Sequence, residues 1–182
     1  MEIKGKVYCL FEQTGIFKNA FKRRGIAAKD IDIESFLGET DWIFDIYDQI
    51  DFYGIREYSI FDHFTPDDLL IAFFPYDYFC AISQCQYRIR SGLLDPKKMD
   101  QIIHKTENYI RLLKLYKICL EKNLRLIVDK PKTYRFLNCS PLQNDKVKRK
   151  PIEPLWEIYK LDQSEITPEY ADTFITDFIL GA

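Results

Sequence analysis

The sequence predicts an α/β protein with a mostly parallel central sheet and helices on both faces. The stretch from Lys6 to Gly25 has the pattern of a buried strand, a tight turn and an amphipathic helix, and a second apolar run follows at once. This succession is the first unit of a parallel, doubly wound sheet of the three-layer, Rossmann-like kind. Short apolar runs then alternate with amphipathic segments along the chain. At 182 residues, we expect positions 1–182 to form a single domain.

The first unit can be divided residue by residue. Val7 to Phe11 is apolar throughout, as in a strand covered on both faces. The turn is Glu12 to Gly15, and Gly25 ends the helix because glycine readily adopts positive φ. The second strand is expected at Ile26 to Ile31. The apolar positions of the helix recur at helical spacing and are Ile16, Phe17, Ala20 and Phe21.

The middle of the chain contains one ambiguous segment and one clear strand. Trp42 to Ile50 is apolar but interrupted by acids, so both a short third strand and a helical turn fit it. Ile60 to Phe64 has the pattern of a short helix. Leu69 to Phe74 is the most hydrophobic run, and we expect it to be a central strand that ends at Pro75.

A long helix, two further strands and a final helix are predicted in the second half. Asp95-Pro96 is a typical helix start, and Asn123 suits a left-handed end. Leu124 to Val128 is a short buried strand, and Leu155 to Tyr159 a weak one. Thr167-Pro168 begins the last helix. The apolar positions expected on one face of the long helix are Met99, Ile102, Ile103, Ile110, Leu113, Tyr116 and Leu120. Those of the last helix are Tyr170, Ala171, Phe174, Ile175, Phe178 and Ile179.

Charge is distributed unevenly along the chain, although the net charge is only −2. Positions 30–68 contain twelve acids and one base, whereas positions 86–150 contain seventeen bases and six acids. Two arrangements fit this pattern. The acidic and basic parts can pack against each other inside the fold, or they can form one acidic and one basic face on the surface.

The composition argues against several classes of protein. The apolar content of 47% argues against a disordered chain. The five cysteines form no short paired spacing, which suits free buried thiols in a reducing cytoplasm. The two histidines form no metal-binding pattern with the cysteines, and no apolar segment has the length of a membrane span. We therefore expect no metal and no membrane association.

The order of turns between Lys6 and Pro131 resembles the S-adenosylmethionine-dependent methyltransferases, most closely the carbon-5 cytosine type. The first motif of that family matches Phe11-Glu12-Gln13-Thr14-Gly15, and its ribose-binding acid would be Asp30 or Asp32. Its later motifs correspond to the dipeptides Asp45-Ile46, Pro75-Tyr76 and Asp129-Lys130. The resemblance implies a methyltransferase-like fold, in which Glu12, Gly15, Asp30 and Asp32 would be remnants of a cofactor site.

Two departures from the family pattern bear on catalysis. Tyr76 stands at the position of the cysteine nucleophile, and tyrosine cannot form the thiolate adduct that activates the base. Gln13 stands at the position of a glycine, where the backbone must approach the cofactor. We therefore expect no methyltransferase activity and no cofactor.

Three segments stand out in the sequence: LFEQTGIFKNAF at positions 10–21, DLLIAFFP at positions 68–75 and RLIVDKP at positions 125–131. They carry a closer resemblance, to type II-A anti-CRISPR proteins from phages and mobile elements. This resemblance implies a non-catalytic inhibitor in the cytoplasm of a bacterial host. Its partner would be the RNA-guided CRISPR nuclease loaded with guide RNA, and the inhibitor would block DNA binding or cleavage.

Charged residues are the candidates for such contacts, because the nuclease surface that holds nucleic acid is positively charged. The partner-binding candidates are Asp41, Asp45, Asp48, Asp51, Asp62, Asp67 and Asp68. The candidates for contact with nucleic acid, including DNA, are Lys146, Lys148, Arg149 and Lys150. The alternative function is a minimal methyltransferase that acts on nucleic acid or a small molecule.

Overall fold

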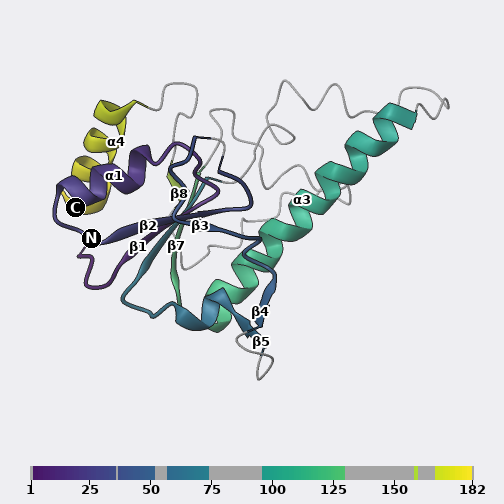
Figure 1. The fold of residues 1–182 in the computed structure, drawn as a ribbon, viewed down its shortest axis with the longest axis horizontal. Helices are drawn as coiled ribbons and strands as arrows, with labels where there is room; N and C mark the ends of the chain where they lie inside the picture. Colours follow the sequence, from purple (N-terminus) through teal and green to yellow (C-terminus); the bar gives the residue numbers. More distant parts are fainter. Residues whose placement is uncertain are drawn as a thin grey trace, which may run out of the picture.

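The computed structural model describes residues 2–35, 37–51, 57–73, 96–129, 158–159 and 167–181. Within these residues, the chain folds around a six-stranded sheet flanked by helices (Figure 1). The strands of this sheet are β1 (Val7–Leu10), β2 (Ala28–Asp32), β3 (Trp42–Ile43), β6 (Leu69–Ala72), β7 (Arg125–Asp129) and β8 (Ile158–Tyr159). The helices are α1 (Ile16–Arg23), the 3₁₀ helix η1 (Ile60–His63), α3 (Pro96–Glu121) and α4 (Pro168–Phe174), which continues into the π-helical segment η3 (Ile175–Leu180).

All neighbouring strands of this sheet run parallel, in the order β3-β2-β1-β6-β7-β8. The prediction of an α/β fold with a mostly parallel sheet is therefore confirmed. The strands β2 and β3 are added on one side of β1, and β6, β7 and β8 on the other side. The direction of strand addition therefore reverses between β1 and β6. In open α/β sheets, ligands bind at the carboxyl ends of the strands beside such a reversal. Pro75, the expected end of the central strand, lies outside the described residues.

The ambiguous segment after Asp41 forms two short strands in different sheets. Trp42–Ile43 pairs with β2 as β3 at one edge of the main sheet. The strand β4 (Gln49–Asp51) instead pairs antiparallel with β5 (Glu57–Ser59) in a separate two-stranded sheet. The predicted short helix is present as η1, which has a reciprocal cap between Ser59 and Asp62.

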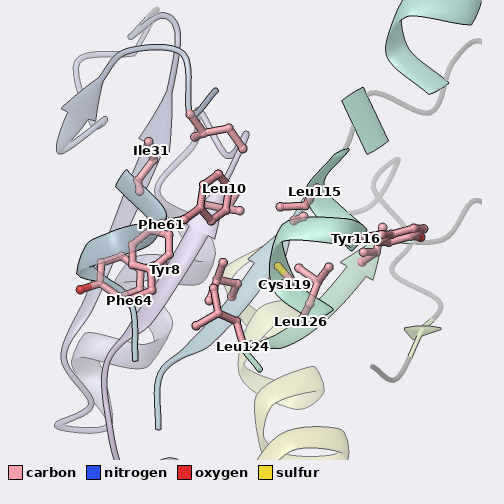
Figure 2. Close-up of a cluster of buried hydrophobic side chains, with 14 of the residues drawn as sticks. Tyr8, Leu10, Ile31, Phe61, Phe64, Leu115, Tyr116, Cys119, Leu124 and Leu126 are labelled. Atoms are coloured by element: carbon pink, nitrogen blue, oxygen red, sulfur yellow. The ribbon is translucent and has the colours of Figure 1, made fainter. Parts of the chain in front are cut away.

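Alternate side chains of the strands build two hydrophobic clusters, one on each face of the sheet. Tyr8 and Leu10 of β1 belong to the cluster that includes η1 and α3 (Figure 2). Val7 and Cys9 belong to the cluster that includes α1, α4 and η3. The period of two in a strand therefore places helices against both faces. In Figure 1, α1 and α4 lie together on the left, and α3 lies on the right.

The helix α3 begins at Pro96 and ends at Glu121 as predicted, and Asn123 is left-handed with φ of 53°. The face predicted to be buried is nevertheless wrong for most of its length. The buried side chains of α3 are Leu112, Leu115, Tyr116 and Cys119. Four of the residues assigned to the core are exposed, namely Ile103, Ile110, Leu113 and Leu120. The error has a physical reason, because α3 carries apolar residues on two faces and periodicity does not tell which of them meets the sheet.

The last helix and α1 are joined side by side on one face of the sheet (Figure 1). Thr167 caps α4 and Pro168 occupies its first turn, as predicted. Arg23 lies 3.0 Å from the carboxylate of Asp172, and Arg24 donates to the side chain and to the carbonyl of the same residue. These bonds connect α1 to α4. Within the described part of the chain, no helix combines the length and apolar character needed to cross a bilayer.

Candidate functional site

A cleft of about 650 Å³ lies at the carboxyl ends of β1, β2 and β6, and its far wall is the middle of α3. This is the position where open parallel sheets bind ligands, and the volume is in the range of small-molecule sites. The lining residues are Phe11, Gln13, Asp32, Ile33, Glu34, Phe73, Glu107, Asn108, Ile110 and Arg111. They combine aromatic rings, amide groups and charges of both signs.

Phe11 follows β1 and is held at the cleft in an unusual backbone conformation. Its φ is 62°, in the left-handed region that bulky residues rarely adopt. Its N–H donates to the carbonyl of Ile31 at 2.8 Å, which ties the end of β1 to the end of β2. A strained residue of this kind costs about 1–3 kcal/mol and persists where its surroundings fix it, commonly at ligand sites. The turn after β1 thus places Phe11 in the wall of the cleft.

Asp32 at the end of β2 supplies a carboxylate to the cleft. Its side chain is buried apart from 6% of its surface, and Oδ1 accepts a hydrogen bond from the N–H of Glu34 at 3.2 Å. Within the described residues, this is the one hydrogen bond of its side chain, so Oδ2 is left for a ligand in the cleft. A carboxylate in this position accepts hydrogen bonds from hydroxyl or amino groups. Asp32, one of the two acids predicted as a remnant of a cofactor site, therefore lies in the cleft, and its role there stays a prediction.

Arg111 provides a cation in the opposite wall, and three contacts hold its side chain and backbone. The guanidinium lies 2.7 Å from Oδ2 of Asp45 and 4.9 Å from the centre of the Tyr47 ring. The hydroxyl of Tyr47 donates to the carbonyl of Arg111 at 2.6 Å, and burial raises the pKa of this phenol. Asp45 therefore belongs to an internal ion pair that connects the segment before β4 to α3.

The side chain of Glu12 accepts hydrogen bonds from the free N–H groups at the N-terminus of α1. Its buried carboxylate accepts hydrogen bonds from the N–H of Phe17 at 2.8 Å, the N–H of Lys18 at 3.4 Å and the hydroxyl of Thr14 at 3.0 Å. Burial raises the pKa of Glu12, and these hydrogen bonds oppose the shift. A helix N-terminus is often a binding site for phosphate, but here the carboxylate of Glu12 already accepts its N–H groups.

Asp30 lies beneath α1 in a buried ionic cluster rather than in the cleft. The ammonium of Lys18 lies 3.0 Å from Oδ1 of Asp30 and 3.4 Å from Oδ2 of Asp41. Burial raises the pKa of Asp30 above its usual value. For Asp41, partial burial is outweighed by hydrogen bonds with Asp30 and by the charges of Lys18 and Lys22, so its pKa is lowered. Of the two acids considered for a ribose, the geometry therefore favours Asp32.

The thiol of Cys9 lies beside this cluster and is fully buried. Burial, followed by the charges of Glu12 and Asp30, raises the pKa of the thiol well above its ordinary value. A thiol of this kind stays protonated at neutral pH and is a poor nucleophile. Within the described residues, no group of acids, histidines and cysteines is arranged to hold a metal ion.

The acidic partner-binding candidates divide into structural and exposed residues. Asp68 is buried, and it accepts hydrogen bonds from the N–H of Lys6, the N–H of Thr65 and the hydroxyl of Thr65. Asp62 is exposed but caps η1 and lies 2.6 Å from Lys122. Asp48 and Asp67 are exposed and form no ion pair among the described residues. For Asp51, the structure describes the backbone in β4 only.

The remaining candidates are placed as follows. Gly15 is left-handed, with φ of 66°, directly before α1, and a Cβ there would lie 3.3 Å from the side chain of Glu39. It therefore shapes the turn and does not line the cleft. The basic candidates Lys146, Lys148, Arg149 and Lys150 lie outside the described residues, as do Tyr76 and Lys130.

Sequence reasoning did not find the α3 wall of the cleft or the role of Lys18. Glu107, Asn108 and Arg111 have the ordinary appearance of a polar helix surface, and only the packing of α3 brings them opposite Asp32. Lys18 stands among exposed bases in the sequence. Helical periodicity places Lys18 outside the apolar face of Ile16, Phe17, Ala20 and Phe21, so its burial becomes visible only in the structure.

Fold and site together define an α/β protein with a parallel sheet and a ligand-sized cleft at the carboxyl ends of its strands. No family model, no curated protein and no solved structure matches the chain.

Proposed function

We propose that the chain is a non-catalytic binding protein on a three-layer, Rossmann-like, methyltransferase-like fold. It acts in the cytoplasm of a bacterial host by binding a guide-loaded type II CRISPR nuclease, and it blocks DNA binding or cleavage. The proposal starts from the resemblance of positions 10–21, 68–75 and 125–131 to type II-A anti-CRISPR proteins. A fold of this type can serve as a scaffold for a binding surface without its original chemistry.

The observation that carries this proposal is the set of exposed acids that positions 30–68 contribute to the surface. Glu34, Asp48 and Asp67 are exposed, and within the described residues none of them forms an ion pair. The sequence has a single lysine or arginine between positions 30 and 68, so this part of the chain is strongly acidic. Such a surface complements the cationic channel in which the nuclease holds its nucleic acids.

The exposure and the internal partners of the acids reduce the number of candidates for contact with the nuclease. Asp45 and Asp68 are bonded to Arg111 and Thr65 within the fold, so they stabilise it rather than face a partner. Asp41 is exposed but already forms an ion pair with Lys18. We therefore centre the proposed contact on Asp48 and Asp67, and the four basic candidates at positions 146–150 would contact nucleic acid. Charges at the rim of such an interface mainly set the rate of association and its salt dependence.

Inhibition of target cleavage by the purified protein tests the proposal. The variant Asp48→Lys/Asp67→Lys should inhibit the guide-loaded nuclease less than the parent, with the larger loss at low salt. A matched control is Glu2→Lys/Asp177→Lys, which reverses two exposed acids outside positions 30–68. The control should inhibit like the parent. Absence of inhibition by the parent, or equal loss in both variants, would contradict the proposal.

The cleft supports a second candidate, methyl transfer from S-adenosylmethionine. The described residues fit this cofactor in part. Asp32 would accept hydrogen bonds from ribose hydroxyls, and the rings of Phe11 and Phe73 would pack against the adenine. The cofactor would supply an electrophilic methyl group, whereas Gln13 occupies lining space where the family has a glycine.

Calorimetric titration with S-adenosylmethionine separates the two candidates. Micromolar binding that is lost in Asp32→Asn, together with transfer of a radiolabelled methyl group to nucleic acid, would favour the second. Binding without transfer would leave the first in place and assign the cleft to a retained ligand. Glu34→Gln is the matched control, because its exposed side chain lies at the cleft and its N–H still donates to Asp32.

A further inference from the structure

The helix α3 carries a second apolar stripe on its exposed side, and this stripe borders the cleft at Ile110. Its C-terminal half packs on the sheet through Leu112, Leu115 and Cys119. In contrast, Ile103, Ile110, Leu113 and Leu120 have exposed fractions of 48%, 49%, 43% and 55%. In Figure 1, α3 forms one outer side of the described fold. Four large apolar side chains exposed in a row on one helix are unusual for a surface that contacts only water.

The spacing of the stripe is that of a coiled-coil seam. From Ile103 to Leu120, the positions advance by three and four residues in turn and include Thr106 and Lys117. The stripe is also symmetric about its midpoint, which lies between Ile110 and Leu113. Its six positions are Ile103, Thr106, Ile110, Leu113, Lys117 and Leu120, so the order of apolar and polar residues is the same from either end. A self-complementary surface of this kind suits an isologous interface with a two-fold axis.

We propose that this stripe binds the same stripe of a second copy of the chain, with the two α3 helices antiparallel. In this arrangement Ile110 of each copy lies against Leu113 of the other, and Ile103 against Leu120. The helices would cross at about 20°, the angle of this type of seam. The interface thus extends along the exposed side of α3 and borders the cleft at Glu107 and Ile110.

Charge favours the antiparallel over the parallel arrangement. A parallel pair would place Lys117 of one copy against Lys117 of the other inside the seam, and like charges there are unfavourable. The antiparallel pair places Lys117 opposite Thr106, whose hydroxyl is already bonded to the carbonyl of Ile102 at 2.9 Å. It also brings Glu107, beside the seam, near Lys114 of the other copy. Because the dimer is two-fold symmetric, the ion pair between Glu107 and Lys114 occurs twice in the interface.

The molar mass in solution tests the proposal directly. Light scattering coupled to gel filtration should give about twice the 21.7 kDa of the chain, with dissociation on dilution from about 100 μM to about 1 μM. Leu113→Glu, at a stripe residue that does not line the cleft, should yield a monomer with an unchanged melting temperature at low concentration. Leu37→Glu, which alters an exposed leucine in the loop after β2, is the matched control and should remain a dimer. A parent that is monomeric at all these concentrations would overturn the proposal.

Exchanging the two flanking charges tests the orientation without touching the apolar stripe. Glu107→Lys and Lys114→Glu should each weaken the dimer about 5- to 30-fold, because two exposed ion pairs are lost. The double variant should restore the affinity. The two residues are seven positions apart on one helix, which separates them by about 10 Å along its axis, so their direct contact requires a second copy. Additive weakening in the double variant would exclude the antiparallel pairing.

Discussion

The ammonium group of Lys18 lies 3.0 Å from Oδ1 of Asp30, and both side chains are buried where α1 meets β2. The same ammonium also donates to the backbone carbonyl of Glu39. One lysine thereby joins the first helix, the second strand and the loop that leads to β3. Burial by itself would lower the pKa of Lys18, but the hydrogen bond and charge of Asp30, with those of Asp41, raise it.

Lys18→Met should destabilise the fold by about 3–5 kcal/mol, because the buried carboxylate of Asp30 loses its cation. The measurement is the free energy of unfolding in urea. Lys18→Met/Asp30→Asn should be less destabilised than the single variant, because no isolated charge then remains buried. Lys22→Met is the control and should change the free energy by less than about 0.5 kcal/mol, since its side chain is 46% exposed. Equal effects at Lys18 and Lys22 would contradict the role of the buried pair.

The neighbours Asp67 and Asp68 should respond differently to the same substitution. Asp68→Ala removes a carboxylate that accepts from the N–H of Lys6 at 2.7 Å and from the N–H of Thr65 at 2.7 Å. We expect a loss of about 2–4 kcal/mol, since hydrogen bonds to charged groups contribute more than neutral ones. Asp67→Ala should stay within about 0.5 kcal/mol in the same thermal unfolding experiment, because its side chain is exposed. Similar losses in both variants would show that the carboxylate of Asp68 has no special structural role.

The dependence of stability on pH should carry the signature of Glu12. Burial raises the pKa of Glu12 in the fold above its ordinary value of 4.5, so the folded state binds this proton more tightly than the unfolded state. The resulting stabilisation is complete below the unfolded pKa and is lost as the pH rises through the folded pKa. Glu12→Gln lacks this titration, so its free energy of unfolding should rise relative to that of the parent as the pH increases above 4.5. A constant difference between the two proteins over this range would contradict the raised pKa.

Two left-handed positions should respond in opposite directions. Gly25 has φ of 74°, and no atom lies within 4 Å of the place that a Cβ would occupy, so Gly25→Ala meets conformational strain alone. We expect a loss of about 1 kcal/mol. Asn123→Gly, at φ of 53°, relieves strain of the same type and should be neutral or slightly stabilising. Thermal unfolding measures both, and a stabilising Gly25→Ala would show that the helix end can change its conformation.

The sheet was the most predictable part of the fold. Val7 to Phe11 and Leu69 to Phe74 are continuous apolar runs in the sequence, which is typical of central parallel strands. The strands they contain, β1 and β6, occupy the middle of the sheet. The helix starts at Pro96 and Pro168 followed from local cap chemistry. These features depend on short stretches of sequence, so the sequence alone was sufficient for them.

The candidate site depended more on tertiary packing. Asp32 was predicted because its position at a strand end follows from the strand itself, whereas Arg111 reaches the cleft only through the packing of α3. The sequence does not indicate which face of α3 packs on the sheet, since two faces of this helix are apolar. Asp68 has the appearance of a surface acid in the sequence, and its burial accompanies a hydrogen bond from the N–H of Lys6 across 62 positions.

The bond between Arg24 and Asp172 spans 148 positions of the chain, and it joins the first helix to the last. The N-terminal strands are synthesised long before α4. Phe17 and Phe21 of α1 therefore lack their packing partner Phe174 until α4 has been made. Contacts so distant in sequence slow folding because a long loop must close first. The aromatic cluster around Phe17 and Phe21 is therefore complete only after almost the whole given sequence has been synthesised.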